Sequence, residues 1–440
     1  MKVLFLCGGV GKRMFPLRED KVLLKFLGKS LLEHQMERAR RAGLDQFVVV
    51  ANPENMGKVE RLAGNVSDVK VEFAVQQEPL GIGDAVQRVE HLLGEDVMVV
   101  NSNDVVESSA YTGLMQEAKK GSAISYLLGY EVREYFPGGY LVVDQEGNLK
   151  QIIEKPPKGE EPGNLVNILV HLHTNMSKFL AYLKDVHSDS DDVYECGLAN
   201  MVSDGGKIKV VPYSDFWSAI KYPWHIFRVV KYFLDSAKPM NSPSARISPK
   251  ATIEGKVIIE DNVRVMENAV IRGPAYIGAN TIIGNNVLVR DYSHIGADCV
   301  VGYCTEVKGS YVGDRCWFHS SYIGDSIIAD GCSFGAGTVL ANFRFDEGNI
   351  SVRVGNELVD TGLDKLGAII GEDCKTGINA SILPGIRIGS NSFVGPHVCL
   401  TTDLESNKMI LPETRYRVMG KATELDEKKR EELLKRLENL

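Results

Sequence analysis

The feature that most constrains this chain is a strict period of six residues in its second half. Aliphatic side chains occupy every sixth position without a break at Ile253, Ile259, Val265, Ile271, Ile277, Ile283, Val289, Ile295, Val301 and Val307. An α-helix repeats about every 3.6 residues and a half-buried strand every second residue, so neither explains this spacing. The period predicts a left-handed parallel β-helix of hexapeptide repeats, in which each repeat forms one short strand and a turn, and three of them make a coil.

The repeat weakens after Val312 and returns at Ile370, Ile382, Ile388 and Val394. The polar segment 349–365 lies between these parts and is predicted to be a loop or arm projecting from the helix. Four cysteines each fall four places after an aliphatic residue of the repeat, at Cys299, Cys316, Cys332 and Cys374. That position needs a small side chain, so these cysteines are interpreted as packing residues. The chain has no CxxC pair, which disfavours a zinc site.

The first half alternates between two kinds of segment. Buried strands are expected at 2–7, 46–51, 71–76 and 97–102, and amphipathic helices at 31–43 and 83–94. This order predicts an α/β domain with a parallel sheet covered by helices on both faces. The expected organisation is therefore a Rossmann-like domain (1–235), a linker (236–247), the β-helix (248–402) and a tail with a charged helix (403–440).

Charge and hydropathy exclude several classes of partner. The chain has 58 acidic and 50 basic residues, a formal net charge of −8, which disfavours nucleic acid and membrane surfaces as partners. No uncharged run is long enough to span a bilayer. The apolar N-terminal run is short and lacks a cleavage-site pattern, so we expect a buried first strand and a cytoplasmic protein.

A glycine-rich loop follows the first expected strand and carries Gly8, Gly9 and Gly11, with Lys12 and Arg13 next to it. Glycines allow backbone N–H groups to approach a phosphate closely, and the cations add charge. The loop is neither GxGxxG nor a Walker motif, so alone it is weak support for a nucleotide site.

Longer segments are more specific. GGVGKRMFPLREDKVLLKFLGKSLLEHQ, QQEPLGIGDA, VVNSNDVV, GGYLVVD, IIEKPP and LVNILVHLH occur in this order over roughly residues 1–230. They resemble the signature segments of the sugar-nucleotide pyrophosphorylases. The resemblance implies that a sugar-1-phosphate oxygen attacks the α-phosphate of a nucleoside triphosphate and that pyrophosphate leaves, a step that depends on positioning and charge neutralisation.

The same resemblance implies a role for each matching residue. Arg13 would stabilise the leaving phosphates, Lys21 would hold the α-phosphate and the sugar phosphate, and Asp104 would bind Mg²⁺. Gln76 and the backbone around Gly81 would read the base. The sugar would be held by Gly139, Glu154, Lys155 and Asn167. Singly, each could be a surface charge or a turn residue, but their order and spacing favour function.

Three positions depart from the family pattern. Lys12 replaces the Thr before Arg, and Asp20 replaces the Pro before Lys. The WxDxGxP segment is present as Trp217 to Pro223 with the sequence WSAIKYP, in which Ala219 replaces the Asp that often completes the metal site. An alanine cannot ligate a cation, so these changes bear on turnover and metal affinity.

The second half carries FHSSYIGDS, SFGAGTVLANFRFD and KLGAIIGEDCKTGINASILPG. These segments resemble the acetyltransferase end of bifunctional enzymes that make UDP-N-acetylglucosamine, above all their archaeal members. By that resemblance His319 is the general base toward glucosamine-1-phosphate, with acetyl-CoA as co-substrate. Tyr322 and Asn342 would hold the sugar phosphate or orient the amine, and Lys308 and Lys365 are weaker phosphate-binding candidates. A homotrimer is implied if this domain is active.

Three functional readings follow. The first is a bifunctional enzyme of UDP-N-acetylglucosamine synthesis. The second uses glucose-1-phosphate with dTTP or UTP and has a purely structural β-helix. The third is a non-catalytic regulatory protein, like subunits of the exchange factor for a translation-initiation GTPase. Lys12, Asp20 and Ala219 keep the third open, whereas Arg13 and Lys21 together with the metal-binding carboxylate argue against it.

Overall fold

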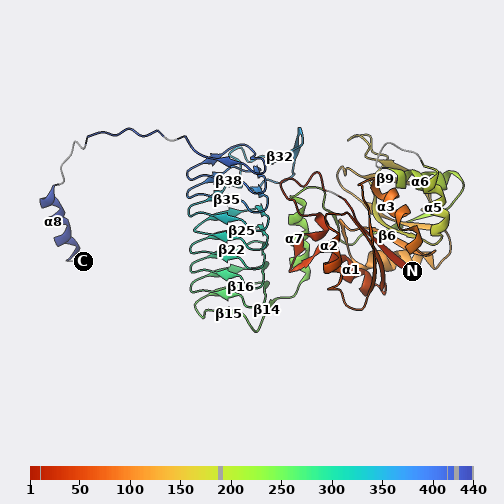
Figure 1. The fold of residues 1–440 in the computed structure, drawn as a ribbon, viewed down its shortest axis with the longest axis horizontal. Helices are drawn as coiled ribbons and strands as arrows, with labels where there is room; N and C mark the ends of the chain where they lie inside the picture. Colours follow the sequence, from red (N-terminus) through yellow and green to blue (C-terminus); the bar gives the residue numbers. More distant parts are fainter. Residues whose placement is uncertain (10, 187–191, 414, 421–425, 439–440) are drawn as a thin grey trace.

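The computed structural model describes residues 1–9, 11–186, 192–413, 415–420 and 426–438. Two bodies lie side by side, an N-terminal α/β domain and a stack of short strands, and the C-terminal tail extends away from the stack (Figure 1). No helix among the described residues is long and apolar enough to cross a membrane.

The N-terminal domain is built on a nine-stranded sheet, whose main path has the order β10-β9-β11-β6-β1-β4-β5. Its strands are β1 (Lys2–Cys7), β4 (Gln46–Ala51), β5 (Lys70–Val75), β6 (Val97–Asn101), β8 (Ser125–Glu131), β9 (Gly139–Val143), β10 (Leu149–Glu154), β11 (Leu165–His173) and β12 (Ile208–Pro212). The four strands expected from sequence are β1, β4, β5 and β6, and they pair in parallel.

The rest of this sheet corrects the prediction of a parallel sheet. Strand β11 runs antiparallel to β6, β8 and β9, and β9 runs antiparallel to β10. No helix intervenes between β8 and β11, so these strands join without the crossover that parallel neighbours require. The sheet is therefore mixed.

Helices cover both faces of the sheet. One face packs against α1 (Leu31–Arg41), α2 (Met56–Ala63) and α4 (Ser108–Ala118), and the other against α3 (Gly81–Arg88), α5 (Met176–Lys184) and α6 (Val193–Ser203). Helix α1 begins with a capping box, because the Ser30 hydroxyl accepts from the backbone N–H of Glu33 and the Glu33 carboxylate accepts from the N–H of Ser30. This cap fixes the end of the loop that precedes α1. We call this loop the signature loop (residues 11–29), because it belongs to the first signature segment.

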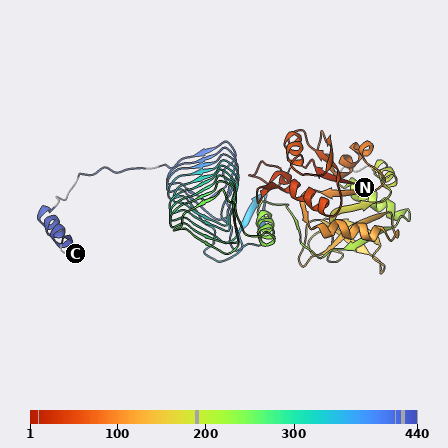
Figure 2. The same cartoon turned by 90° about the horizontal axis from the view of Figure 1, so that it is seen from below.

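The second body is the predicted β-helix, with three parallel sheets of eight, nine and eight strands. They run from β14 (Met240–Asn241) to β37 (Arg387–Ile388), from β15 (Arg246–Ile247) to β40 (Met409–Ile410), and from β16 (Thr252–Glu254) to β39 (Cys399–Leu400). Each strand pairs with the strand one coil further on. That partner is three places later in most of the stack, as where Ile283 lies beside Val301, and five places later where the arm interrupts the repeat. The repeat's aliphatic side chains form one buried column inside the stack. Figure 2 shows the stacked coils from below. The paired strands extend at both ends into segments that the sequence assigned to linker and tail.

The predicted arm is a hairpin of β32 (Ser351–Val354) and β33 (Glu357–Asp360). Ile350 and Val352 are buried beside helix α7 (His225–Ser236), so the arm contacts the junction between the two bodies.

The cysteines Cys299, Cys316, Cys332 and Cys374 are free and buried in the β-helix core, which agrees with a packing role. Among the described residues no group of three or more His, Cys, Asp or Glu side chains is placed to hold a metal.

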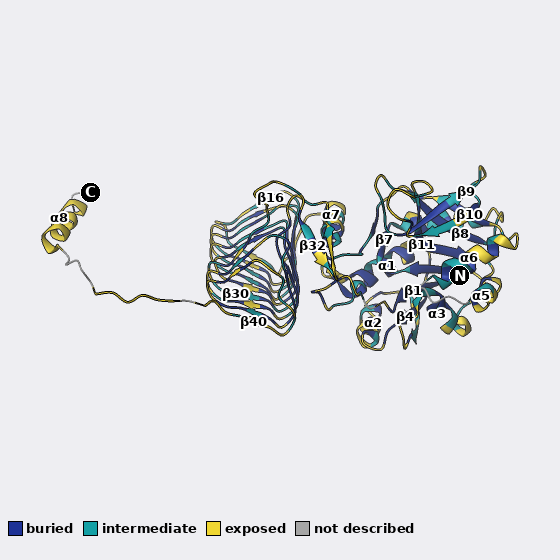
Figure 3. Cartoon of the chain, turned by 90° about the horizontal axis from the view of Figure 1, so that it is seen from above, coloured by how far each residue is buried: buried dark blue, intermediate teal, exposed yellow. Residues whose placement is uncertain are grey.

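The two bodies share an apolar interface that includes Met14, Phe26 and Phe233 on one side and Tyr311 and Ile327 on the other. Polar contacts reinforce it: Lys25 Nζ lies 2.6 Å from Asp314 Oδ2, and the backbone N–H of Leu27 donates to His294 Nε2 at 3.2 Å. The signature loop of the first domain is thus held directly against the β-helix. The charged helix expected in the tail is α8 (Glu427–Leu437), which is exposed throughout (Figure 3).

Candidate functional sites

The nucleotide-binding candidates meet at the end of β1. A Cβ added to Gly8 would lie 2.6 Å from Gln76 Oε1, so a side chain here would force the Gln76 amide to shift. The Gln76 amide is buried and donates to the carbonyl of Gly81 at 2.9 Å and to Asp84 Oδ2 at 2.8 Å. The structure therefore brings Gly8, Gln76 and Gly81 together. Gly9 is exposed in the same loop.

One cation of the signature loop, Lys21, lies within electrostatic reach of the proposed metal-binding carboxylate. Lys21 begins the short helix η1 (Lys21–Leu23), and its Cε lies 3.9 Å from where a Cβ on Gly11 would stand. Burial lowers the pKa of Lys21, while the negative charge of Asp104 opposes that shift and the positive charge of Arg13 adds to it. Lys21 is thus within electrostatic reach of both Arg13 and Asp104.

Asp104 begins β7 (Asp104–Val106) and is buried. Its Oδ1 accepts from Trp217 Nε1 at 3.0 Å, and its Oδ2 accepts from Asn101 Nδ2 at 3.0 Å. Burial raises the pKa of this carboxyl, and the two hydrogen bonds and the charges of Lys221 and Lys21 oppose that rise. Ala219 lies directly opposite Asp104 on the antiparallel strand β13 (Trp217–Ala219).

The sugar-binding candidates gather where β9, β10 and β11 meet. A Cβ on Gly139 would lie 2.8 Å from Glu154 Oε2 and 3.6 Å from Asn167 Cβ, so these three residues are immediate neighbours. Lys155 Nζ lies 3.2 Å from Glu154 Oε1. The structure therefore forms one polar patch from Gly139, Glu154, Lys155 and Asn167.

Sequence reasoning missed a buried chain of hydrogen bonds behind this patch. His171 Nε2 contacts Asn167 Oδ1, and the Tyr194 hydroxyl lies 3.1 Å from His171 Nδ1 and 2.8 Å from His173 Nε2. The Ser125 hydroxyl completes the chain at 2.8 Å from His173 Nδ1. The only sequence signal was the pair of histidines in an otherwise apolar buried strand.

Lys221 was also missed as a site residue. Its ammonium group lies 3.7 Å from the centroid of the Phe136 ring and donates to the carbonyl of Pro137. Burial lowers the pKa of Lys221 to about 8, and Asp104 and Glu154 are the acidic groups that act on it most strongly. Lys221 thus lies between the metal-binding candidate and the sugar-binding patch.

The structure shows the surroundings of Asp20 and Lys12, two of the three residues that depart from the family pattern. The Asp20 carboxylate accepts from Asn55 Nδ2 at 2.7 Å and from Asn52 Nδ2 at 3.3 Å, which ties the signature loop to the start of α2. Lys12 is exposed. Asp20 therefore has a structural task in this chain that a proline could not perform.

In the β-helix, four polar side chains cluster around Gly324. A Cβ on Gly324 would lie 2.7 Å from the Tyr322 hydroxyl and 2.8 Å from Asn342 Nδ2. Lys308 Nζ lies 2.6 Å from Asp325 Oδ2, which also accepts from Asn342 Nδ2 at 2.5 Å. Asp325, which the sequence analysis did not single out, therefore joins two of the predicted residues.

His319 and Lys365 stand at the edges of this cluster. His319 is exposed on the corner before β28 (Tyr322–Gly324), and its imidazole makes no hydrogen bond or ion pair with any residue that the structure describes. Lys365 is exposed, and its backbone bridges to Phe343, next to Asn342. The structure thus brings Lys308, Tyr322 and Asn342 together and leaves the His319 ring facing outward.

Family models match both bodies. The model described as nucleotidyl transferase matches residues 2–220, and the model described as bacterial transferase hexapeptide (six repeats) matches residues 256–291 and 367–402. The chain is 36% identical over 415 residues to the "Bifunctional protein GlmU" of Methanococcus maripaludis (strain C7), covering 93% of this chain and 97% of that protein. The chain belongs to the bifunctional GlmU family.

Two further relatives share the whole arrangement. The "Bifunctional sugar-1-phosphate nucleotidylyltransferase/acetyltransferase" of Sulfurisphaera tokodaii is 31% identical, with 92% of this chain and 98% of that protein covered. The "Bifunctional protein GlmU" of Methanocaldococcus jannaschii is 31% identical, with 93% and 97% covered. This GlmU-family chain is therefore an enzyme of the nucleotidyltransferase class, and the regulatory reading is set aside.

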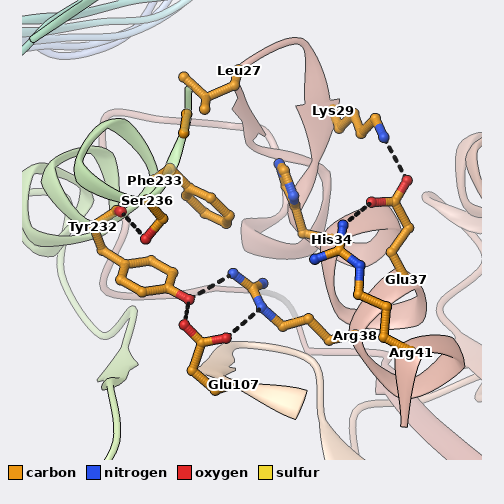
Figure 4. A pocket seen from close by; sticks show the side chains of 11 residues that line it. Leu27, Lys29, His34, Glu37, Arg38, Arg41, Glu107, Tyr232, Phe233 and Ser236 are labelled. Carbon is orange, nitrogen blue, oxygen red and sulfur yellow. Dashed lines mark hydrogen bonds and ion pairs between the residues drawn. The ribbon is translucent and has the colours of Figure 1, made fainter. Parts of the chain in front are cut away.

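A separate pocket of about 280 Å³ opens between α1 and α7 (Figure 4). Arg38 Nη2 donates to the Tyr232 hydroxyl at 3.2 Å, and that hydroxyl donates to the Glu107 carboxylate. Arg38 also lies over the Phe233 ring. None of the residues predicted for either reaction lines this pocket, so in this GlmU-family chain it lies apart from both sites.

Proposed function

We propose that this chain makes UDP-N-acetylglucosamine, transferring a uridylyl group in its first domain and an acetyl group in its β-helix. The observation that carries the first activity is the convergence of Arg13, Lys21 and Asp104 beside the patch that contains Glu154 and Asn167. These groups come from separate segments, and packing of the fold does not by itself require them to be neighbours.

The proposed uridylyl transfer runs as an in-line displacement. A phosphate oxygen of N-acetylglucosamine-1-phosphate attacks the α-phosphorus of UTP, a new P–O bond forms, and the bond to the β-phosphate oxygen breaks to release pyrophosphate. Lys21 holds the α-phosphate and the sugar phosphate, and Arg13 stabilises the charge on the leaving pyrophosphate. Gln76 and the backbone at Gly81 hold the base.

The donor set at Asp104 fits a Mg²⁺ ion that is shared with the triphosphate. Mg²⁺ is commonly bound by one or two carboxylates together with substrate phosphates and waters, and Asp104 supplies one carboxylate. Such an ion would neutralise charge on the phosphate oxygens. Ala219 provides no second carboxylate opposite it.

The proposed acetyl transfer uses glucosamine-1-phosphate and acetyl-CoA. The amine nitrogen attacks the thioester carbonyl carbon, His319 accepts the proton that the amine loses, and the C–S bond breaks to release coenzyme A. Lys308 binds the sugar phosphate, Lys365 adds positive charge at the rim, and Tyr322 and Asn342 orient the sugar. Because His319 faces outward, we propose a homotrimer in which a neighbouring copy closes this site.

Pyrophosphate release from purified protein with Mg²⁺ tests the first activity. UTP and dTTP are each paired with N-acetylglucosamine-1-phosphate and glucose-1-phosphate. The proposal expects the fastest release with UTP and N-acetylglucosamine-1-phosphate. Preference for glucose-1-phosphate, with no thiol released from acetyl-CoA by glucosamine-1-phosphate, would instead favour a nucleotidyltransferase with a structural β-helix.

A further inference from the structure

The position opposite the metal-binding candidate has lost its carboxylate. Ala219 and Asp104 are direct partners on the antiparallel strands β13 and β7. Side chains at such positions have Cβ atoms about 5 Å apart, so an aspartate at residue 219 would place a second carboxylate beside the first. With alanine, this chain presents Asp104 alone.

A lysine occupies the same short segment two residues later. In the WxDxGxP pattern of the related enzymes, the position of Lys221 is glycine, which carries no charge. The Lys221 ammonium group donates to the Pro137 carbonyl and lies 3.4 Å from where a Cβ on Gly138 would stand. It therefore reaches the turn that leads into the sugar-binding strand β9.

The surroundings of Lys221 suit a bound anion. An ammonium group has three N–H donors, and among the described residues Pro137 supplies its one hydrogen-bond acceptor. The charges that act on it come from Asp104, Glu154, Arg13 and Lys155, which belong to the two halves of the same site. A sugar held at Glu154 and Asn167 would direct its 1-phosphate toward the gap between these halves.

The two substitutions change the local charge in the same direction. Alanine in place of aspartate removes one negative charge, and lysine in place of glycine adds one positive charge. Together they shift the local charge by the formal charge of one divalent cation, and the Lys221 charge acts on Asp104 itself.

We propose that the Lys221 ammonium group binds the phosphate of the sugar-1-phosphate and supplies charge that a cation between two carboxylates supplies in related chains. The site then binds its phosphorylated sugar without a divalent metal. This inference rests on the proposed function of the first domain and adds a phosphate-binding residue that the family pattern lacks.

Isothermal titration of the full-length protein with N-acetylglucosamine-1-phosphate in EDTA tests the proposal. The matched variants are Lys221→Met, which keeps the stem over Phe136, and Lys150→Met, which removes an exposed lysine from the start of β10. We expect binding by the wild type and by Lys150→Met, and at least about tenfold weaker binding by Lys221→Met. Equal affinity of Lys221→Met and the wild type in EDTA would overturn the proposal.

The double variant Ala219→Asp/Lys221→Gly gives a second readout. It should bind the sugar phosphate poorly in EDTA and regain affinity when Mg²⁺ is added, whereas tight binding in EDTA would contradict the proposal. If the wild type fails to bind this sugar phosphate even with Mg²⁺, the proposed substrate is wrong. The role of Lys221 is then tested with inorganic phosphate as the ligand. Lys221→Met must bind inorganic phosphate more weakly than the wild type does.

Discussion

His171 Nε2 lies 2.9 Å from Asn167 Oδ1, so a buried imidazole holds the amide of a proposed sugar-binding residue. Burial lowers the pKa of His171 well below its usual value, so the ring is neutral and carries one N–H. If the Tyr194 hydroxyl donates to Nδ1, then Nε2–H donates to Asn167. Every group is satisfied in this direction, and the Asn167 NH₂ is left to bind the sugar.

Breaking this link should weaken sugar binding selectively. His171→Phe leaves Asn167 free to rotate, and we expect the KM for the sugar-1-phosphate to rise about tenfold while the KM for UTP stays unchanged. Steady-state pyrophosphate release with each substrate varied in turn measures both constants. A rise of both constants by the same factor would indicate general damage to the fold and would count against a positioning role.

The two reactions should separate by mutation. Lys21→Ala removes the charge that we propose holds the α-phosphate, so we expect nucleotidyl transfer to fall by at least about a hundredfold. Acetyl transfer should stay unchanged, because Lys308, Tyr322 and Asn342 lie in the other body. Loss of both activities in a variant that remains folded, as judged by circular dichroism, would contradict separate sites.

His319→Ala tests the other domain. Without an imidazole to accept the amine proton, release of coenzyme A with glucosamine-1-phosphate should fall by about a hundredfold or more, while pyrophosphate release is unaffected. Thiol titration of released coenzyme A measures this activity. Unchanged acetylation in this variant would remove His319 from the mechanism.

The β-helix also holds the loop that carries Lys21, the proposed catalytic lysine. Glu372 accepts hydrogen bonds from the backbone N–H groups of Arg18 and Glu19, at 3.0 and 3.2 Å. Glu372→Ala should free this loop and lower the kcat of nucleotidyl transfer by up to about thirtyfold, because bonds to a charged group are worth about 2 kcal/mol. Asp373→Asn, at the exposed neighbouring position, is the matched control. An equal fall in kcat in both variants would show that the contact of Glu372 with the loop has no specific role.

His294 makes the contact between the bodies sensitive to acid. Its ring lies between Tyr276 and Tyr311, and burial lowers its pKa from 6.5 to about 4, although the Asp314 charge opposes that shift. The folded state therefore stays neutral at this residue while the unfolded chain gains a proton below about pH 6.5. We expect His294 to lower the free energy of unfolding by about 2 kcal/mol between pH 7 and pH 5.

Denaturant titration of the wild type and His294→Gln at both pH values checks this expectation. The variant should be less stable at pH 7 but lose less stability on acidification. Equal losses of free energy of unfolding in the two proteins would show that protonation of His294 does not cause the loss. Other buried histidines, such as His34, contribute equally to both proteins and cancel in the comparison.

The sequence predicted the β-helix well because each coil repeats a local pattern, so Ile283 and Val301 fall in register from their spacing alone. The family resemblance assigned roles to Arg13, Lys21 and Asp104, and the structure places Lys21 within reach of the charges of the other two. The sequence did not predict the mixed sheet, since the antiparallel pairing of β11 depends on strand order in space, for which residues 165–173 carry no local signal.

The residues that were missed act through contacts between distant segments. Glu372 meets Arg18 across 354 positions of the chain, and no periodicity marks such a pair. Lys221 stands at a position where the family pattern has glycine, so the resemblance assigns no chemical role to this residue. Asp325 lies within a recognised segment, but its role is visible only once Lys308 and Asn342 are placed beside it.

The most direct test of the central claim is product formation from glucosamine-1-phosphate, UTP and Mg²⁺, followed by mass spectrometry with and without acetyl-CoA. The account predicts UDP-N-acetylglucosamine when acetyl-CoA is present and little nucleotide sugar when it is absent, because the proposed substrate of the first domain is the acetylated sugar phosphate. Failure of folded wild-type protein to form any nucleotide sugar, even from N-acetylglucosamine-1-phosphate supplied directly, would contradict it.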